Sequence, residues 1–408
     1  MSTMGDSSSS ASLARHVNHL ASLLVPKPSA SSAPSTVVSA YGVVHALSML
    51  IPGAGPSTAS HAALLRTLYG GLDEASAQKA IKELSTSLQS ILEEANAAFV
   101  ASSLPIQDSY REALEGSYDA EIRPLESATV VNNWVAEKTH EKITSIIDDS
   151  VAAQAALILI NAIYFKESWE HEFDPRDTNQ MPFTRLDGSS VTADMMYMKY
   201  EKTGTTFMSG WEFETADGVE CVAARLRYHG GRVSAVFARP KGAEDAGGGG
   251  EVRGAGEAKN AGDGNYEERL VSCQEAVLHQ RPAWRVVDKR AGGYQAGKIF
   301  LPRFEAEIEH GLTTVLKSDR LGLGSIFEPG DFVRIGDSRL AVSDVKQKVF
   351  LKVDETGTEA AAVTAVIALR MMPLRPVDEL FILLDKPFYF GIVDEATGLH
   401  VFSGVISL

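Results

Sequence analysis

"VKQKVFLKVDETGTEAAAVTA", residues Val345–Ala365, joins two unlike patterns in one segment. The part before Asp354 reads as an apolar strand, whereas the ten residues 360–369 carry no charge and five of them are alanine. Such side chains are too small for an ordinary core strand and too apolar for an ordinary surface loop. The stretch therefore predicts a buried strand that leads into an exposed connection with a special task.

The alternation of this connection is the first clue to its task. In an extended chain, alternate residues face the same side. The even positions are uncharged and small at the leading end, and they are Thr358, Ala360, Ala362, Thr364, Val366 and Ala368. Glu359 is odd and faces the other way, so the even face could enter a packed sheet without burying a charge. The alternative is an alanine-rich solvated loop that never inserts.

The rest of the chain predicts an α+β protein, because helical patterns lie mainly early and apolar strands mainly late. Ala155–Lys166, "AALILINAIYFK", is a continuous apolar run that predicts a strand covered on both faces. Helical spacing is found at Ala11–Leu24, Ala75–Leu92 and around Val130–Ile147. Late strands are expected in "GKIFLPRFEAEIE", "ELFILLDKPFYFGIVD" and "LHVFSGVISL".

Two segments are not expected to join the packed core. Residues 1–10 are predicted to form a disordered tail before a single domain, 11–408. Residues 241–265, "KGAEDAGGGGEVRGAGEAKNAGDGN", have too few apolar side chains to offset the entropy of ordering. Because strand-like sequence resumes on both sides, they are interpreted as a flexible insertion within one domain.

Bulk properties exclude several classes of partner. The chain has 408 residues, 44% hydrophobic content and a net charge of −15, which argues against nucleic acid and anionic membrane surfaces. The N-terminus lacks the pattern of a signal peptide, so a cytoplasmic location is expected, with an extracellular one as the alternative. The two cysteines, Cys221 and Cys273, are far apart in sequence; reduced thiols are expected, and a single disulfide is the alternative.

Signatures of catalysis are absent from the sequence. There is no G-x-S-x-G elbow, no H-E-x-x-H and no phosphate-binding loop. His140 and His171 stand alone on predicted surface segments, which does not make a metal site. The chain is therefore expected to be neither an enzyme nor a carrier of a metal or other cofactor.

Five passages, in chain order, resemble motifs of the serpin (serine protease inhibitor) family. They are "NNWVAEKTHEKITSII" (Asn132–Ile147), "NAIYFKESWEHEF" (Asn161–Phe173), "LPRFEAEIEHGLTTVLKSDRLGLGSIFEPGDF" (Leu301–Phe332), Val345–Ala365 and "DKPFYFGIVDEATGLHVFSG" (Asp385–Gly404). The resemblance implies three β-sheets with about nine helices and an exposed reactive-centre loop. Hinge and loop would together span 355–376.

The resemblance implies irreversible inhibition of serine endopeptidases by a suicide mechanism. A protease cleaves the loop, whose N-terminal part then inserts into the main sheet and drags the acyl-linked enzyme with it. The hinge residues carried over are Glu355, Gly357, Thr358, Glu359, Ala360, Ala361, Ala362, Thr364 and Ala365. The alternative is a non-inhibitory serpin with a binding, storage or chaperone role, but such relatives commonly have bulky or charged residues in the hinge.

The cleaved bond can be placed by counting along the loop. Fourteen residues beyond Gly357, the usual spacing in inhibitory serpins, lies Met371, so Met371–Met372 is the expected reactive bond. Methionine suits the apolar primary pocket of chymotrypsin- or elastase-like proteases. The alternative bond, Arg370–Met371, would suit a trypsin-like enzyme. The resemblance also allows papain-like cysteine proteases as partners.

Further residues match positions of the family that control sheet opening. Glu355 matches a glutamate that pairs with a basic residue at Arg303, and Trp169 matches a tryptophan at the top of the main sheet. Asn161 and Ser39 match polar groups that would lie beneath the strands that must part, and Gln347 occupies a further position of this set. Gln347 stands where the family usually has histidine; Gly42 and Ala40 also depart from its "S-P-x-S" pattern. The basic patch of heparin-activated members is missing, so activation by heparin is not expected. The protein is expected to be a monomer.

Overall fold

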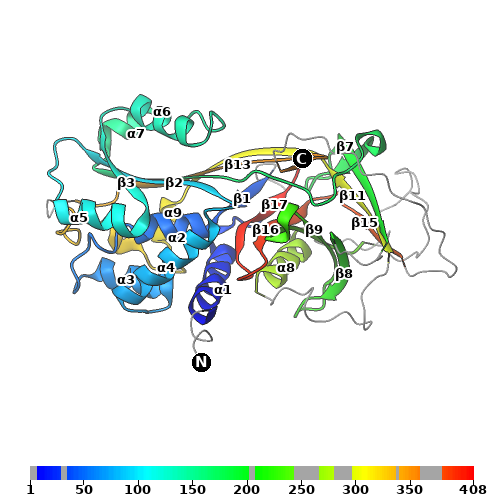
Figure 1. Cartoon of the computed structure of the whole chain (residues 1–408), viewed down its shortest axis with the longest axis horizontal. Coiled ribbons are helices and arrows are strands. Elements are labelled where there is room, and N and C mark those ends of the chain that lie inside the picture. The colour runs from blue at the N-terminus through cyan, green and yellow to red at the C-terminus, as the bar shows by residue number, and fades with distance from the viewer. Residues whose placement is uncertain are drawn as a thin grey trace.

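The computed structural model describes residues 7–28, 35–201, 207–242, 266–279, 296–336, 340–358 and 379–408. Within these ranges the chain forms three β-sheets and nine α-helices (Figure 1). The α+β architecture with three sheets and about nine helices, expected from the sequence, is confirmed. Most of the glycine-rich insertion, residues 243–265, and the connection 359–378 lie outside the described residues.

The main sheet spans the middle of the molecule (Figure 1). Its strands, in spatial order, are β3 (Ala120–Leu125), β2 (Glu93–Ala101), β4 (Leu157–Tyr164), β13 (Asp344–Val353), β14 (Gly357–Thr358) and β5 (Glu167–Ser168), with β12 (Phe304–Gly311) paired to β13. β4 and β13 run parallel, and β12 and β14 run antiparallel to β13. The register of β4 and β13 joins Ile158 to Asp344 and Tyr164 to Phe350.

β4 is buried at all eight of its positions, as its unbroken apolar sequence predicts. Alternate side chains enter different cores: Ile158 and Ile160 pack beneath α6 (Ala128–Lys138), while Leu159 and Ile163 face the larger core on the other side. Each fully buried branched side chain of this kind contributes about 1.5–3 kcal/mol. The strand at the centre of the sheet is therefore held from both faces.

Two further sheets complete the framework. One contains β1 (Thr36–Val38), β17 (His400–Ile406), β16 (Phe388–Asp394), β10 (Val233–Pro240), β9 (Glu220–Arg227) and β8 (Met208–Glu214). The other contains β15 (Glu379–Leu383), β11 (Ala296–Pro302), β7 (Ser190–Glu201) and β6 (Asn179–Thr184). The remaining helices are α1 (Ser7–Leu24), α2 (Ala40–Ser48), α3 (Ala59–Tyr69), α4 (Glu74–Leu88), α5 (Asp108–Ala113), α7 (Asp149–Gln154), α8 (Tyr266–His279) and α9 (Thr313–Lys317).

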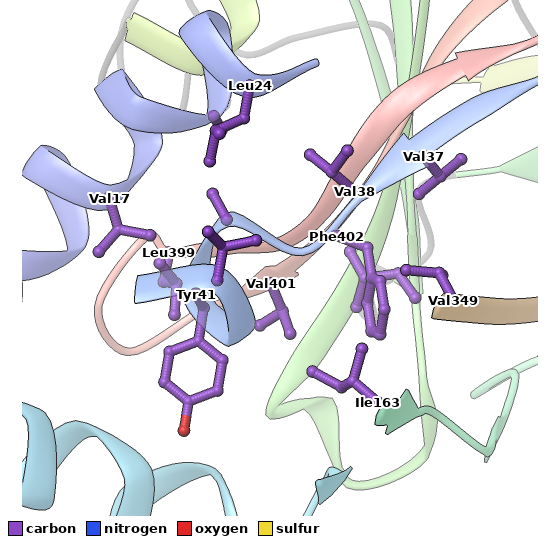
Figure 2. Close-up of a cluster of buried hydrophobic side chains, with 14 of the residues drawn as sticks. Val17, Leu24, Val37, Val38, Tyr41, Ile163, Val349, Leu399, Val401 and Phe402 are labelled. Carbon is purple, nitrogen blue, oxygen red and sulfur yellow. The ribbon is translucent and has the colours of Figure 1, made fainter. Parts of the chain in front are cut away.

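The larger core lies where α1 and α2, β17 and the main sheet meet. Figure 2 shows Val17 of α1, Tyr41 of α2 and Phe402 of β17 gathered with Ile163 of β4 and Val349 of β13. All five side chains are at most 1% exposed. The two central strands of the main sheet are thus packed against elements from both ends of the chain.

Two boundaries differ from the sequence-based prediction. α1 begins at Ser7, so residues 7–10 belong to the helix and only the first part of the expected tail, 1–6, lies outside the described residues. Once the apolar face from Leu13 onward is anchored, the helical ladder can extend through serines at little cost. α6 ends at Lys138 rather than Ile147, because His140 and Glu141 adopt left-handed backbone angles, with φ of 50° and 61°.

The segment after α6 crosses the outer face of the main sheet. Asn132 of α6 holds it, accepting hydrogen bonds from the amides of Ile146 (2.8 Å) and Ile147 (3.2 Å). Lys348 of β13 donates to the carbonyl oxygen of Ser145 at 2.6 Å. This segment therefore crosses the sheet from the side of β2 and β4 to β13. None of the helices in the described ranges is long and apolar enough to span a membrane.

Candidate functional site

The hinge predicted from the sequence begins inside the main sheet. Gly357 and Thr358 form β14, which lies between β13 and β5. Thr358 pairs with Val353 on one side and with Glu167 on the other, while Gly357 pairs with Ser168. The first two residues of the connection therefore already occupy the place of a strand, beyond the point where β4 and β13 pair directly.

A tight turn joins β13 to β14. The amide of Asp354 donates to the Gly357 carbonyl oxygen at 3.0 Å. The Asp354 carboxylate accepts hydrogen bonds from the Thr356 amide (2.9 Å) and the Thr356 hydroxyl (2.7 Å). Side-chain bonds of this kind from aspartate fix a local reversal of the backbone. The hinge thus starts from a defined hairpin.

Thr358 is fully buried beside Tyr228, whose ring stacks on Trp169. Its hydroxyl lies 2.7 Å from the Tyr228 hydroxyl, and neither side chain is exposed to solvent. Tyr228 stacks on Trp169 with ring centroids 4.4 Å apart and an interplanar angle of 15°. Trp169 also binds the turn, because its ring N–H donates to the Asp354 carbonyl and its amide donates to the Thr356 carbonyl, both at 2.9 Å. Trp169 therefore holds the turn at the start of the hinge in place.

The position of Gly357 tolerates no side chain. A Cβ atom there would lie 2.2 Å from the Glu167 carbonyl oxygen and 2.7 Å from the Ser168 Cα atom. Real Cβ atoms do not approach backbone so closely, so any other residue would displace β14 from β5. Glycine is required here for close approach of the two strands.

An ion pair holds the start of the hinge. Arg303 donates to Glu355 from Nε at 2.7 Å, and a hydrogen bond from the Thr178 hydroxyl satisfies the same carboxylate. Burial alone would raise the pKa of Glu355, but the bonds from Arg303 and Thr178 outweigh burial and lower it. The bond to Glu355 raises the pKa of Arg303. Both groups are therefore charged at neutral pH, and the pair anchors β13 and β14 to the strand that Arg303 follows.

Lower in the sheet, Gln347 ties β13 to both β4 and α2. Its amide nitrogen donates to Asn161 Oδ1 at 2.7 Å and to the Ser39 carbonyl at 3.0 Å, while its oxygen accepts from the Ser39 amide at 2.9 Å. Gln347 and Asn161 are direct register partners in the parallel pair. A Cβ atom on Gly42 would lie 2.4 Å from Asn161 Oδ1. Two of the departures from the family pattern, Gln347 and Gly42, thus fit together, since Gly42 leaves the room that Asn161 needs to reach Gln347.

Behind Asn161 lies a buried network that was not among the residues predicted from the sequence. Asn161 Nδ2 donates to Asn96 Oδ1 (2.9 Å) and to Glu94 Oε1 (3.1 Å). The second oxygen of Glu94 lies 3.1 Å from His45 Nδ1 and accepts a hydrogen bond from the Tyr41 hydroxyl at 2.8 Å. Polar contacts therefore run continuously from β13 through β4 and β2 to α2.

The network contains an ion pair between His45 and Glu94. Burial would lower the pKa of His45, but the Glu94 carboxylate and the Tyr118 carbonyl outweigh it and raise the pKa above its ordinary value. Burial would raise the pKa of Glu94, but His45, Asn96 and Tyr41 together lower it. The imidazolium can donate from both nitrogens, to Glu94 and to the Tyr118 carbonyl at 2.9 Å. The positive charge therefore stays compensated inside the fold.

A signal for these residues was present in the sequence. Tyr41 and His45 are four residues apart on one helix, and Glu94 and Asn96 are two apart on one strand, so each pair shares a face. Polar residues at such spacing in otherwise apolar elements indicate a shared partner. Within the described ranges, no cluster of three or more histidine, cysteine or carboxylate side chains could hold a metal.

The structure brings the residues predicted to control sheet opening together in two groups. Around the hinge lie Trp169, Arg303 and Glu355. Below the hinge lie Ser39, Asn161 and Gln347. The predicted reactive residues lie outside the described ranges, together with most of the hinge. They are Arg370, Met371 and Met372, and Glu359, Ala360, Ala361, Ala362, Thr364 and Ala365.

Comparison with known proteins accounts for this arrangement. The family model "Serpin (serine protease inhibitor)" matches residues 15–252 and 265–407. The chain belongs to the serpin family. It is 29% identical to Iripin-3 of Ixodes ricinus, covering 96% of this chain and 93% of that protein, and 30% identical to Serpin-Z1C of Triticum aestivum, covering 96% and 94%. The crystal structure of Serpin48 from Tenebrio molitor covers the full length of both chains with a TM-score of 0.73 and 21% identity.

The family assignment also bears on the glycine-rich segment. The match to the serpin family model is interrupted between residues 252 and 265, which fall within the predicted insertion 241–265. The serpin sequence pattern continues on both sides of this interruption. The extent of the insertion, 241–265, stays a prediction.

We expect Tyr228 and Thr358 to be energetically coupled, because each hydroxyl is the buried partner of the other. Tyr228→Phe or Thr358→Val alone should lower the free energy of unfolding by about 1 kcal/mol, since one hydroxyl loses its partner. The double variant should be less destabilised than the sum of the two. Urea unfolding followed by tryptophan fluorescence measures all four proteins, and strictly additive effects would contradict the contact.

We expect the His45–Glu94 pair to give a pH-dependent contribution to stability. Because the pKa of His45 is raised, this contribution is complete below about pH 6.5 and is lost as the pH rises through the folded-state pKa. Relative to wild type, His45→Gln should lower the free energy of unfolding by about 3 kcal/mol near pH 6 and by less near pH 9.

The matched control for this test is the double variant His45→Gln/Glu94→Gln, which has no buried carboxylate left without its cation. It should regain part of the stability lost by His45→Gln. The measurement is the urea unfolding midpoint from about pH 6 to pH 9. A loss on His45→Gln that stays constant across this range would show that the pair carries no titrating interaction.

Proposed function

We propose that this serpin is an irreversible, suicide-substrate inhibitor of serine endopeptidases. The observation that carries the proposal is the placement of Gly357 and Thr358 as a short strand between β13 and β5. The sequence that follows repeats the small, uncharged side chains that suit the buried side of this strand. A loop that begins inside a sheet, and whose next residues have a compact face, is suited to extend that strand.

The chemical step requires no residue of this chain to act as a catalyst. The serine hydroxyl of the protease attacks the carbonyl carbon of Met371, the peptide bond to Met372 breaks, and the new amino group leaves with a proton from the protease. Met371 then remains attached to the protease as an ester. Hydrolysis of that ester competes with insertion of the loop, and insertion must be faster for the protease to be trapped.

Insertion requires β4 and β13 to separate below β14. The side-chain bond between Gln347 and Asn161 crosses this gap and must break, together with the backbone bonds of the parallel register. An inserted strand would replace them with two new sets of backbone bonds, each bond contributing about 0.5–1.5 kcal/mol net. Because one set is lost and two are gained, the inserted form is the more stable one.

Met371 and Arg370 point to different target proteases. An apolar residue at the cleaved bond suits chymotrypsin- or elastase-like enzymes, whereas cleavage after Arg370 suits a trypsin-like enzyme. We propose Met371–Met372 as the reactive bond, because the distance from Gly357 fits it. Papain-like cysteine proteases are a further class to be tested.

We expect a chymotrypsin- or elastase-like protease to form a covalent complex that survives boiling in SDS. The protein is incubated with one protease of each class, trypsin-like and papain-like enzymes included, and the released C-terminal fragment is identified by mass spectrometry. The fragment should begin at Met372; a start at Met371 would move the reactive bond to Arg370. Cleavage in this region by every protease, without any complex or rise in melting temperature, would indicate a non-inhibitory binding or storage protein.

We expect Thr358→Arg to convert the inhibitor into a substrate. Thr358 is 0% exposed, so arginine at this position should keep β14 out of the sheet before cleavage, and insertion would then have to bury an unpaired charge at a cost of several kcal/mol. Since each 1.4 kcal/mol in a barrier is about a tenfold change in rate, insertion should lose the race against hydrolysis of the ester. The stoichiometry of inhibition should rise at least tenfold.

Glu359→Arg is the matched control for Thr358→Arg, because the next residue of an extended strand faces the opposite side. It introduces the same side chain one position later and should leave the stoichiometry close to that of wild type. Both variants and wild type are titrated against one target protease. Equal stoichiometries for all three would remove the insertion mechanism.

A further inference from the structure

Two histidines from distant parts of the chain meet on the surface where α1 and α8 pack side by side (Figure 1). His19 lies on α1, and His279 is the last residue of α8. Their ring centroids are 5.3 Å apart, and the ring planes are inclined at 45°. Both side chains are exposed, so an ion can reach them from solvent without any unfolding.

The packing of the two helices sets the distance between these histidines. Leu20 follows His19 and Leu278 precedes His279, and the two leucines are only 4% and 2% exposed. Both leucines belong to the larger core of the protein. Because the neighbouring residue is anchored on each helix, only the side-chain torsions of the two histidines remain to be adjusted.

The ring nitrogens of this pair are available to a ligand. Six other histidines have a hydrogen-bond partner, and these are His16, His45, His61, His140, His310 and His400. Within the part of the chain that the structure describes, the rings of His19 and His279 contact each other and make no such bond. Each neutral imidazole therefore has a nitrogen lone pair that it can donate to a metal ion.

The separation of the rings matches two imidazoles bound to one ion. The bond from a metal to a histidine nitrogen is about 2.0–2.1 Å long, and the ring centre lies about 1.2 Å beyond that nitrogen. Two rings on one tetrahedral ion therefore have centroids about 5.2 Å apart, and at a right angle about 4.5 Å. The observed 5.3 Å is close to the tetrahedral value. Because the rings are tilted rather than stacked face to face, small side-chain rotations can turn one nitrogen of each toward a common point.

We propose that His19 and His279 bind one divalent transition-metal ion, which links α1 to α8. Water fills the remaining positions of the ion, since no third histidine, cysteine or carboxylate of the described ranges completes the set. Imidazole nitrogen suits Cu²⁺, Ni²⁺ and Zn²⁺, and Cu²⁺ should bind most tightly of the three. The expectation of no metal was based on lone histidines, whereas the fold forms this pair. The proposal does not rest on protease inhibition.

A third histidine nearby, His16, has a different role. It lies on α1 one turn before His19, and residues three apart on a helix are close enough to share a ligand. However, its Nε2 lies 2.8 Å from the carbonyl oxygen of Thr67 on α3. A hydrogen bond to a carbonyl requires the proton on this nitrogen, so Nε2 has no lone pair for an ion. His16 therefore joins α1 to α3, and His279 is the partner of His19.

The test uses the untagged full-length protein and copper(II) iminodiacetate as the probe. The chelator blocks part of the copper coordination sphere and leaves room for two imidazoles. Electron spin echo envelope modulation distinguishes one bound imidazole from two, and the wild-type protein should show two. Calorimetric titration gives the affinity for the probe, and Ni²⁺ and Zn²⁺ should compete for the same site.

Four variants distinguish this pair from other histidines. His19→Gln and His279→Gln should each leave one bound imidazole and weaken the affinity for the probe at least about tenfold, because the second attachment is lost. His171→Gln, which removes an exposed histidine stacked on Phe207, and His16→Gln should bind like wild type. Circular dichroism checks that all four variants are folded. The proposal is overturned if wild type binds copper through a single imidazole, if His279→Gln binds as tightly as wild type, or if His16→Gln abolishes binding.

Discussion

The direct pairing of β4 with β13 is the contact on which the rest of this structure depends. These two strands are hydrogen-bonded in parallel along seven register pairs, from Asp344 opposite Ile158 to Phe350 opposite Tyr164. Beyond that point β14 lies antiparallel to both β13 and β5. Parallel pairing is slightly less stable per residue than antiparallel pairing. In the proposed mechanism, a longer β14 would exchange one parallel contact for two antiparallel ones.

The polar groups beneath this contact form a substitute for the family's usual set. Where serpins commonly have a histidine, Gln347 makes three hydrogen bonds to Ser39 and Asn161. A histidine is still present in the network, but it is His45 on α2, paired with Glu94. A buried carboxylate requires a cation or several donors, and Glu94 has both. The chain thus departs from the pattern at several linked positions rather than at one.

How much of this structure the sequence could predict depends on how far apart in the sequence the interacting residues lie. β4 was evident because its apolar run is local. The ends of α1 and α6 were misplaced, because a helix boundary depends on tertiary anchoring and on backbone angles such as those of His140 and Glu141. The Glu94–His45 pair joins residues 49 positions apart. No local pattern shows which distant partner a buried polar side chain will meet.

The turn at Asp354–Thr356 gives the proposed rearrangement a direction. Because β14 is fixed at the Val353 end and Gln347 holds the strands together further down, opening can begin only beside Thr358. Each residue that enters can pair with β13 and β4 before the next register pair has to separate. The strands of the sheet would then separate progressively from one fixed end. Few backbone groups would lack a hydrogen bond at any stage. The segment after α6 crosses above β13, where the hydrogen bond from Lys348 to the Ser145 carbonyl holds it. In the proposed rearrangement this segment would have to move before the second half of the loop could insert.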